Sequence, residues 1–340
     1  MSNQTSDNNK IATNLKRQNI RFNDISILRV IAMLMVVFYH CLCPYSIWDH
    51  TDYFIGFHVP IWDVVNGILY QIHLPIFFII SGYLYGYKRI LGGYKVTHDF
   101  VINKSERVLF PYIIVGAFLC VLQHREIGQM LNGISHLWFL LVIFECYLLG
   151  RFFENVLWFK NKPQRLLIIL AVLFIIGLSY RIPTVKFLAL WGLFRYFPFY
   201  LIGMLMCNID FEKLAKYKTA IFCGIIGMVL CLVFQQLFMK RVLLSYLLGV
   251  VVVLLSFSYA RIIYIKKLPK SVISLDKCSM GIYIVHHIVI QEMNPCFPFH
   301  EMAVNHYYAY PIFQFFIVTG VSWLFVAVSQ NFKYSKYVLG

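Results

Sequence analysis

The chain has 340 residues, of which 60% are hydrophobic and only 13% are charged. Its mean hydropathy of +0.70 excludes an ordinary soluble enzyme and predicts an integral membrane protein. The net charge of +15 does not indicate a nucleic-acid-binding protein, because the Lys and Arg residues recur between apolar runs and form no single basic arm or helix.

Ten apolar runs approach the length of roughly 20 residues that a helix needs to cross a bilayer. In chain order they are 25–44, 65–87, 108–124, 136–151, 166–180, 187–207, 219–239, 242–260, 279–294 and 310–330. The fourth and fifth are short, which predicts tilt or interruption. The sequence therefore predicts an all-α fold, a polytopic transmembrane helical bundle of about ten spans.

The basic residues fall mainly into every second loop of this arrangement. Of the 30 Lys and Arg residues, 23 lie in the set of loops that includes both termini, five lie in the other set, and two lie within spans. Positively charged loops stay in the cytoplasm, so both termini are predicted to be cytoplasmic. The predicted organisation is a cytoplasmic tail at 1–24, a transmembrane domain at 25–330 and a cytoplasmic tail at 331–340.

The first predicted span carries two ionisable residues, Arg29 and His40, which are expensive to place in a membrane. Their spacing of eleven residues is about three helical turns, so they share one face and lie roughly 16 Å apart along the axis. In one interpretation, both side chains simply reach the two membrane interfaces. In the other, Arg29 holds an anionic group that enters from the cytoplasm and His40 acts as a general base.

The second span contains His73 and Ser81, and a basic loop follows it. His73 is either structural or part of a site, and Ser81, beside Gly82, also suits a close contact between helices. Lys104 and Arg107 are three residues apart at a predicted helix start. They are candidates to clamp phosphate groups, although the preference for positive charge in the cytoplasm also explains them.

Later spans contain further ionisable residues. Glu145 lies in the fourth span and needs a partner, and Arg195 in the sixth either reaches the interface or pairs with Glu145. His286 and His287 are adjacent in the ninth span, where neighbours point about 100° apart, so at least one of them should face the bundle interior.

Motifs typical of soluble hydrolases, nucleotide-binding folds and zinc proteases are absent from the sequence. No CxxC pair accompanies a histidine pair, so no metal site is predicted. Among the nine cysteines, Cys41, Cys43 and Cys296 could lie near an oxidising face, where a disulfide is possible.

Several segments resemble the membrane-bound acyltransferase-3 family. Arg29 and His40 match its R-x10-H signature, and the sequence FFIISGY at 77–83 is similar to its second-span pattern. Further similar segments are HLWFL at 136–140, RYFPFYLIG at 195–203 and SMGIYIVH at 279–286. The order and spacing of these segments also fit the family.

The chain departs from the family pattern in two places. The family's R-x-x-R motif appears as Lys104-Ser-Glu-Arg107, and Lys lacks the bidentate fork with which Arg binds phosphate, so donor binding is expected to depend more on Arg107. The C-terminal sequence lacks the E-R-P ending and the fused periplasmic domain of some relatives. It is similar to the type that stands alone as a surface polysaccharide O-acetyltransferase.

The resemblance implies a multi-pass enzyme of the bacterial plasma membrane that moves acetyl from cytoplasmic acetyl-CoA to a hydroxyl group. The acceptor would be a cell-envelope or exported polysaccharide, or its lipid-linked precursor. Acetyl-CoA would be a co-substrate, with no permanently bound cofactor. In this reading His40 and Arg29 are catalytic, and Lys104, Arg107 and Ser81 bind the donor. His73, Glu145, Arg195 and His286 are candidates for additional site residues. The alternative is a transporter or flippase of a lipid-linked sugar, because intramembrane Arg, Glu and His residues also mark translocation paths.

Overall fold

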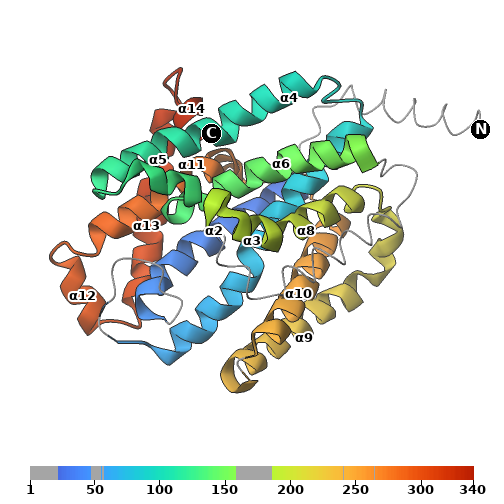
Figure 1. The fold of residues 1–340 in the computed structure, drawn as a ribbon. Helices are drawn as coiled ribbons and strands as arrows, with labels where there is room; N and C mark the ends of the chain where they lie inside the picture. The colour runs from blue at the N-terminus through green and yellow to red at the C-terminus, as the bar shows by residue number, and fades with distance from the viewer. Residues whose placement is uncertain (1–21, 47–54, 56, 158–185, 240, 264) are drawn as a thin grey trace, which may run out of the picture.

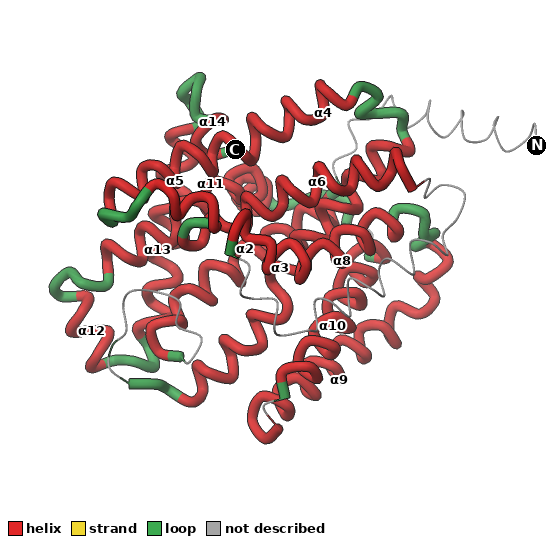
Figure 2. The backbone as a smooth tube through the Cα atoms, in the orientation of Figure 1, coloured by secondary structure: helices red, strands yellow, loops and turns green. Residues whose placement is uncertain are grey.

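The computed structural model describes residues 22–46, 55, 57–157, 186–239, 241–263 and 265–340. Within these ranges every regular element is helical, and no strand is present (Figure 2). The long helices are α2 (Asn23–Leu42), α3 (Pro60–Ile90), α5 (Phe110–Leu122), α6 (Trp138–Leu157), α8 (Leu190–Met206), α9 (Lys218–Phe234), α10 (Val242–Ile262), α11 (Lys270–Met293) and α13 (Tyr310–Ser329). The short ones are α4 (Thr97–Lys104), α12 (Phe299–Asn305) and α14 (Lys336–Leu339).

Nine helical segments of the described ranges are long and apolar enough to cross a membrane. They correspond to nine of the ten predicted runs, and the remaining run, 166–180, lies outside the described residues. A helix satisfies its backbone hydrogen bonds within the segment, which a lipid environment requires. The predicted all-α transmembrane bundle is therefore confirmed.

The third of these segments is not a single regular helix. α4 passes into α5 through a π-helical turn at Ser105–Leu109. Pro111 follows, and because proline has no N–H, the carbonyl of Arg107 four residues earlier loses its usual helical donor. The π-helical turn thus lies where the Lys104-Ser-Glu-Arg107 motif was expected to bind the donor, and such turns often occur at functional sites.

Contacts between helices establish the directions in which they run. Gly192 lies against Trp138 and Val142, and Gly150 lies against Tyr200, so α6 and α8 are parallel. Likewise, α2 and α11 are parallel, since Arg29 pairs with Asp276 and His40 contacts His286. Helices on either side of the undescribed stretch 158–185 therefore begin at the same end of the bundle, as ten spans would require.

α3 and α8 cross at very short range. A Cβ added at Gly82 would lie 1.9 Å from the carbonyl oxygen of Tyr200, and one added at Gly203 would lie 2.2 Å from that of Ile79. Only glycine fits such a contact, and small residues at helix crossings are the usual device of membrane bundles. Ser81 stands next to this crossing, as the close-contact interpretation expected.

α9 and α10 lie side by side at one edge of the bundle (Figure 1). α9 exposes large apolar side chains along its length, including Phe222, Ile226, Leu230 and Phe234. In the membrane-spanning segment that contains α9, Glu212–Met239, only 11% of the most apolar stretch is buried within the protein. Such a surface is suited to contact with lipid.

The C-terminal residues, predicted as a tail, contain the helix α14, which packs against α5 and the π-helical turn. Lys336 Nζ lies 3.4 Å from Glu106 Oε2, and the rings of Tyr337 and Phe110 are 6.1 Å apart between centroids. Leu339 is buried in the same contact. The motif at 104–107 is thus covered on one side by the last helix of the chain.

Candidate functional site

Histidine rings from three parts of the chain meet inside the bundle. We call His40 of α2, His136 of the short helix Ser135–Leu137, and His286 and His287 of α11 the histidine cluster. The His40 centroid lies 5.0 Å from those of both His286 and His287, and the His136 centroid lies 4.6 Å from that of His287. His136, His286 and His287 are at most 5% exposed.

Backbone carbonyls fix the tautomers of two of these rings. Nδ1 of His286 lies 3.1 Å from the carbonyl oxygen of Ile282, and Nδ1 of His40 lies 2.9 Å from that of Val36. Because a carbonyl oxygen only accepts, both Nδ1 atoms carry the proton when the rings are neutral. His286 Nε2 then has a lone pair, which lies 3.1 Å from His40 Nδ1 and can accept from it.

This arrangement leaves the basic lone pair of His40 on Nε2. The Nδ1–H is directed at two acceptors, Val36 O and His286 Nε2, which orient the ring. An imidazole held in this way is suited to remove a proton from a hydroxyl group. The structure therefore brings His40 and His286, two of the expected site residues, into contact.

His136 and His287 complete the cluster and were not among the expected site residues. His136 Nε2 donates to the carbonyl oxygen of Ile284 at 2.9 Å, and the Tyr283 hydroxyl donates to the carbonyl oxygen of His136. These bonds fasten the start of α6 to the middle of α11. His287 stacks on His136, and its buried Nδ1 has no hydrogen-bond partner among the described residues. Both residues of the His286–His287 pair thus face inward, where at least one was predicted to do so.

Arg29 lies on the same helix as His40 but is already engaged by an acidic residue. Its Nε is 2.9 Å from Asp276 Oδ1, and the Ser26 hydroxyl donates to the other Asp276 oxygen at 2.8 Å. Asp276 was not anticipated as a partner, although it is an acidic residue near a predicted span. The pair largely neutralises Arg29 and ties α2 to α11 about three turns below the histidine cluster.

The expected donor-binding residues lie elsewhere. Lys104 Nζ stands 3.8 Å above the centre of the Tyr147 ring, and Arg107 is exposed on the π-helical turn. Ser81 lies on α3 beside the crossing with α8. In the described part of the chain no ion pair or hydrogen bond joins Arg29 to Lys104 or Arg107; Arg29 pairs with Asp276, and Lys104 stands over Tyr147.

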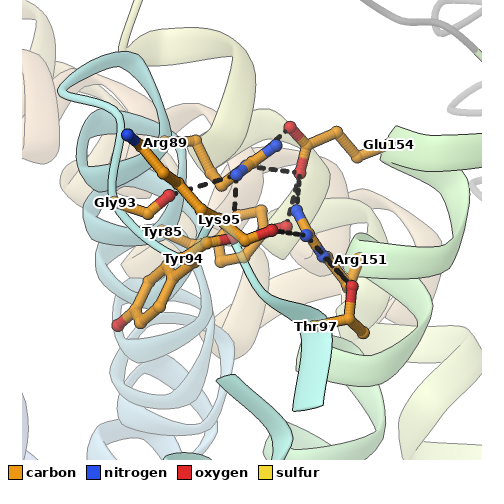
Figure 3. Close-up of polar contacts among 8 residues, drawn as sticks. All are labelled: Tyr85, Arg89, Gly93, Tyr94, Lys95, Thr97, Arg151 and Glu154. Atoms are coloured by element: carbon orange, nitrogen blue, oxygen red, sulfur yellow. Dashed lines mark hydrogen bonds and ion pairs between the residues drawn. The ribbon is translucent and has the colours of Figure 1, made fainter. Parts of the chain in front are cut away.

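A polar cluster that sequence reasoning missed lies between the ends of α3 and α6 (Figure 3). Glu154 accepts from Arg89 Nε at 2.8 Å and from Arg151 Nη1 at 3.3 Å, and the Tyr85 hydroxyl also donates to it. Arg151 further donates to Thr97 Oγ1. Two guanidinium groups share one carboxylate here, which leaves net positive charge near the base of α4. The spacing of Arg151 and Glu154, three residues apart, was the available signal.

His73 and Arg195 belong to an aromatic region next to the cluster. His73 contacts the Leu69 carbonyl through Nδ1, and its ring lies 4.9 Å from that of Tyr39. Arg195 donates to the Tyr70 hydroxyl at 3.0 Å, with its guanidinium 4.6 Å from the centre of that ring.

Glu145 does not pair with Arg195, which was one of the two interpretations of that arginine. Its Oε2 is buried, and no hydrogen-bond partner for it occurs among the described residues. This oxygen of Glu145 therefore forms no hydrogen bond with the histidine cluster.

The described cysteines, all nine of the chain, are free thiols, so the possible disulfide is not formed. Across the described ranges, no group of His, Cys, Asp and Glu side chains is arranged to hold a metal ion.

A family model described as an acyltransferase domain, that of the acyltransferase-3 family, matches residues 22–329. The match covers nearly the whole chain and includes every helix of the bundle from α2 to α13. No curated protein and no solved structure shows significant similarity to the chain.

Proposed function

Because the chain belongs to the acyltransferase-3 family and is a membrane acyltransferase, we propose that it is an O-acetyltransferase of surface glycans. The donor would be cytoplasmic acetyl-CoA, and the acceptor a hydroxyl group of a cell-envelope or exported polysaccharide or its lipid-linked precursor. One observation supports this proposal most: His40 is held with its lone pair on Nε2 and a second imidazole behind Nδ1.

In the proposed reaction, His40 Nε2 takes the proton of the acceptor hydroxyl while the oxygen of that hydroxyl attacks the thioester carbonyl. The new C–O bond forms, the C–S bond breaks, and the coenzyme A thiolate takes the proton back from His40. His286 Nε2 accepts the Nδ1–H of His40 throughout and stabilises the imidazolium that forms between these steps. No proton is gained or lost overall.

The donor is a polyanion, so a basic end of the bundle would gather it. Lys104, Arg107 and the positively charged cluster around Glu154 support a donor site near α4 and the π-helical turn. Arg29 would act from its ion pair with Asp276 and position α2 and His40 against α11. Ser81, His73, Glu145 and Arg195 remain proposed contributors without an assigned step.

The test is a glycan profile from the native producer. Mass spectrometry of its envelope glycan should show acetyl groups that disappear when the gene is deleted and return when the wild-type gene is restored. His40→Ala should fail to restore them and lower the rate of transfer about 10²- to 10⁴-fold, at equal protein levels in the membrane. Accumulation of unpolymerised precursor with normal acetylation would instead indicate a flippase.

A further inference from the structure

A polar bridge links the C-terminal end of α5 to α11. Gln123 Nε2 donates to Gln291 Oε1 at 2.7 Å, although the two residues are 168 positions apart in the chain. Both side chains are half-buried, so the bridge lies where the interior of the bundle reaches its surface. None of the family-like segments includes either glutamine.

The bridge continues inward to the histidine cluster. Gln291 follows His287 by four residues, so both lie on one face of α11, and the Gln291 side chain lies next to the His287 ring. Arg125 is close enough for its charge to act on the same ring. The His287 ring is in turn 5.0 Å from that of His40. Polar side chains thus lead from the protein surface to the ring beside the proposed base.

Two buried atoms along this path have unused hydrogen-bonding capacity. Gln123 Oε1 and His287 Nδ1 are both inaccessible to solvent, and neither has a hydrogen-bond partner within the described ranges. Buried polar atoms are nearly always satisfied, so such atoms beside a proposed active site suggest that a ligand supplies the missing partners.

We propose that Gln123 and Gln291 form the subsite that binds a polyhydroxylated acceptor and directs one hydroxyl group toward His40. This assignment rests on the proposed acetyl transfer. A primary amide offers two donors and one acceptor group, which suits neighbouring sugar hydroxyls that both donate and accept. On binding, the acceptor replaces the Gln123–Gln291 hydrogen bond with bonds of its own, and its hydroxyls reach Gln123 Oε1 and His287 Nδ1.

The two ends of the bundle would then have separate tasks. Lys104 and Arg107 lie at the start of the segment that ends at Gln123, one membrane-spanning helix away. The donor would approach from the basic end and the acceptor from the glutamine end, with His40 between them. Substitution at the bridge should therefore affect the use of the acceptor and leave the use of the donor unchanged.

The experiment uses the full-length protein in membranes, [¹⁴C]acetyl-CoA as donor and an extract of envelope glycan from the deletion strain as acceptor. Transfer is measured while the amount of extract is varied, and then while acetyl-CoA is varied. Gln291→Ala should raise the amount of extract needed for half-maximal transfer about 3- to 10-fold, as expected for loss of about one hydrogen bond, with the KM for acetyl-CoA unchanged.

Gln330→Ala is the matched control, because Gln330 also bridges to α11, through the Lys277 carbonyl, but at the opposite end of that helix. It should change neither half-saturation value. Gln123→Ala should resemble Gln291→Ala, and the double variant should lose little more than either, since the two amides act as one subsite.

An unchanged requirement for the glycan extract in Gln291→Ala would overturn the subsite and leave the acetyltransferase proposal intact. Equal changes in the half-saturation values of donor and acceptor would do the same, because they would indicate a general disturbance of the bundle. If the wild-type protein transferred no acetyl group to the extract, the proposed function and the subsite would both fail.

Discussion

At the residue scale, His40 is oriented by two contacts that use a single nitrogen. Its Nδ1–H is directed at the Val36 carbonyl in its own helix and at His286 Nε2 in α11. The first contact is local and would exist in an isolated α2, whereas the second forms only when the helices pack. In the proposed reaction His286 therefore acts as a positioning residue, and its contribution can be separated from that of the proposed base, His40.

We expect His286→Ala to lower kcat about 10- to 100-fold, because a hydrogen bond to a group that becomes charged is lost. The KM for acetyl-CoA should stay unchanged, since His286 is remote from the basic end. His286→Asn should retain more activity than His286→Ala, because its side-chain oxygen can accept the same hydrogen bond. His300→Ala, at an exposed histidine of α12, is the control. A KM for acetyl-CoA that rises as much as kcat falls would contradict the positioning role.

The sequence was informative about single residues but not about their partners. Arg29 and His40 stand out because ionisable residues in an apolar run are costly, and the adjacent His286 and His287 stand out for the same reason. Asp276 and His286 are 247 and 246 residues away from their partners, and no periodicity in one helix reports on the face of another. For Glu145 and Arg195, opposite charge alone suggested a pairing that packing does not produce.

At the element scale, α2 and α11 are joined at two heights by the Arg29–Asp276 pair and the His40–His286 contact. A second ion pair connects α2 with α10 through Asp24 and Arg261. The rotation and height of α2 are therefore set by polar contacts on two neighbouring helices. This matters because lipid gives little hydrophobic drive for helices to choose one register over another.

A charge-removal series can separate positioning by Arg29 from direct donor binding. Asp276→Asn and Arg29→Gln should each lower the free energy of unfolding by about 1 to 2 kcal/mol, since one partner of a pair with a buried carboxylate is left without its counter-charge. The double variant should recover most of the stability and part of the activity. An inactive double variant with restored melting behaviour in detergent would show that Arg29 itself contacts the donor.

The crossing of α3 and α8 gives a second prediction for an element. Gly82→Val should abolish the folded protein, because the added side chain would overlap the Tyr200 carbonyl and overpacking costs about 1 to 3 kcal/mol or more. Gly227→Val on the lipid-facing α9 is the control, as no atom lies within 4 Å of an added Cβ there. Fluorescence-detected size-exclusion chromatography measures both. A monodisperse Gly82→Val protein with unchanged melting temperature would contradict this close contact.

At the scale of the whole molecule, the helix pairs α6–α8 and α2–α11 show which helices run in the same direction, which hydropathy alone does not. The runs were predictable because lipid demands about 20 apolar residues per crossing, whatever the function. The packing of α14 was not, since it depends on contacts with α5 and the π-helical turn, which lie far earlier in the sequence. The run at 166–180 lies outside the described residues.

The predicted orientation is tested by reporter fusions. Alkaline phosphatase, which is active only outside the cytoplasm, should be inactive when fused after Gly340 and active when inserted in the loop at 123–126. Green fluorescent protein, which needs the cytoplasm, should give the opposite result. An active phosphatase after Gly340 would invert the topology, and would place the basic end of the bundle away from cytoplasmic acyl-CoA.

The position of α14 also has a consequence for the timing of biosynthesis. The π-helical turn at Ser105–Leu109 enters the membrane early, yet the side chains that cover it, Tyr337 and Leu339, are translated more than 220 residues later. A nascent chain therefore carries the π-helical turn without its covering helix during most of its synthesis. The motif at 104–107 acquires these surroundings only once α14 has been made, so premature termination near residue 335 would leave the long helices in place and the π-helical turn uncovered on that side.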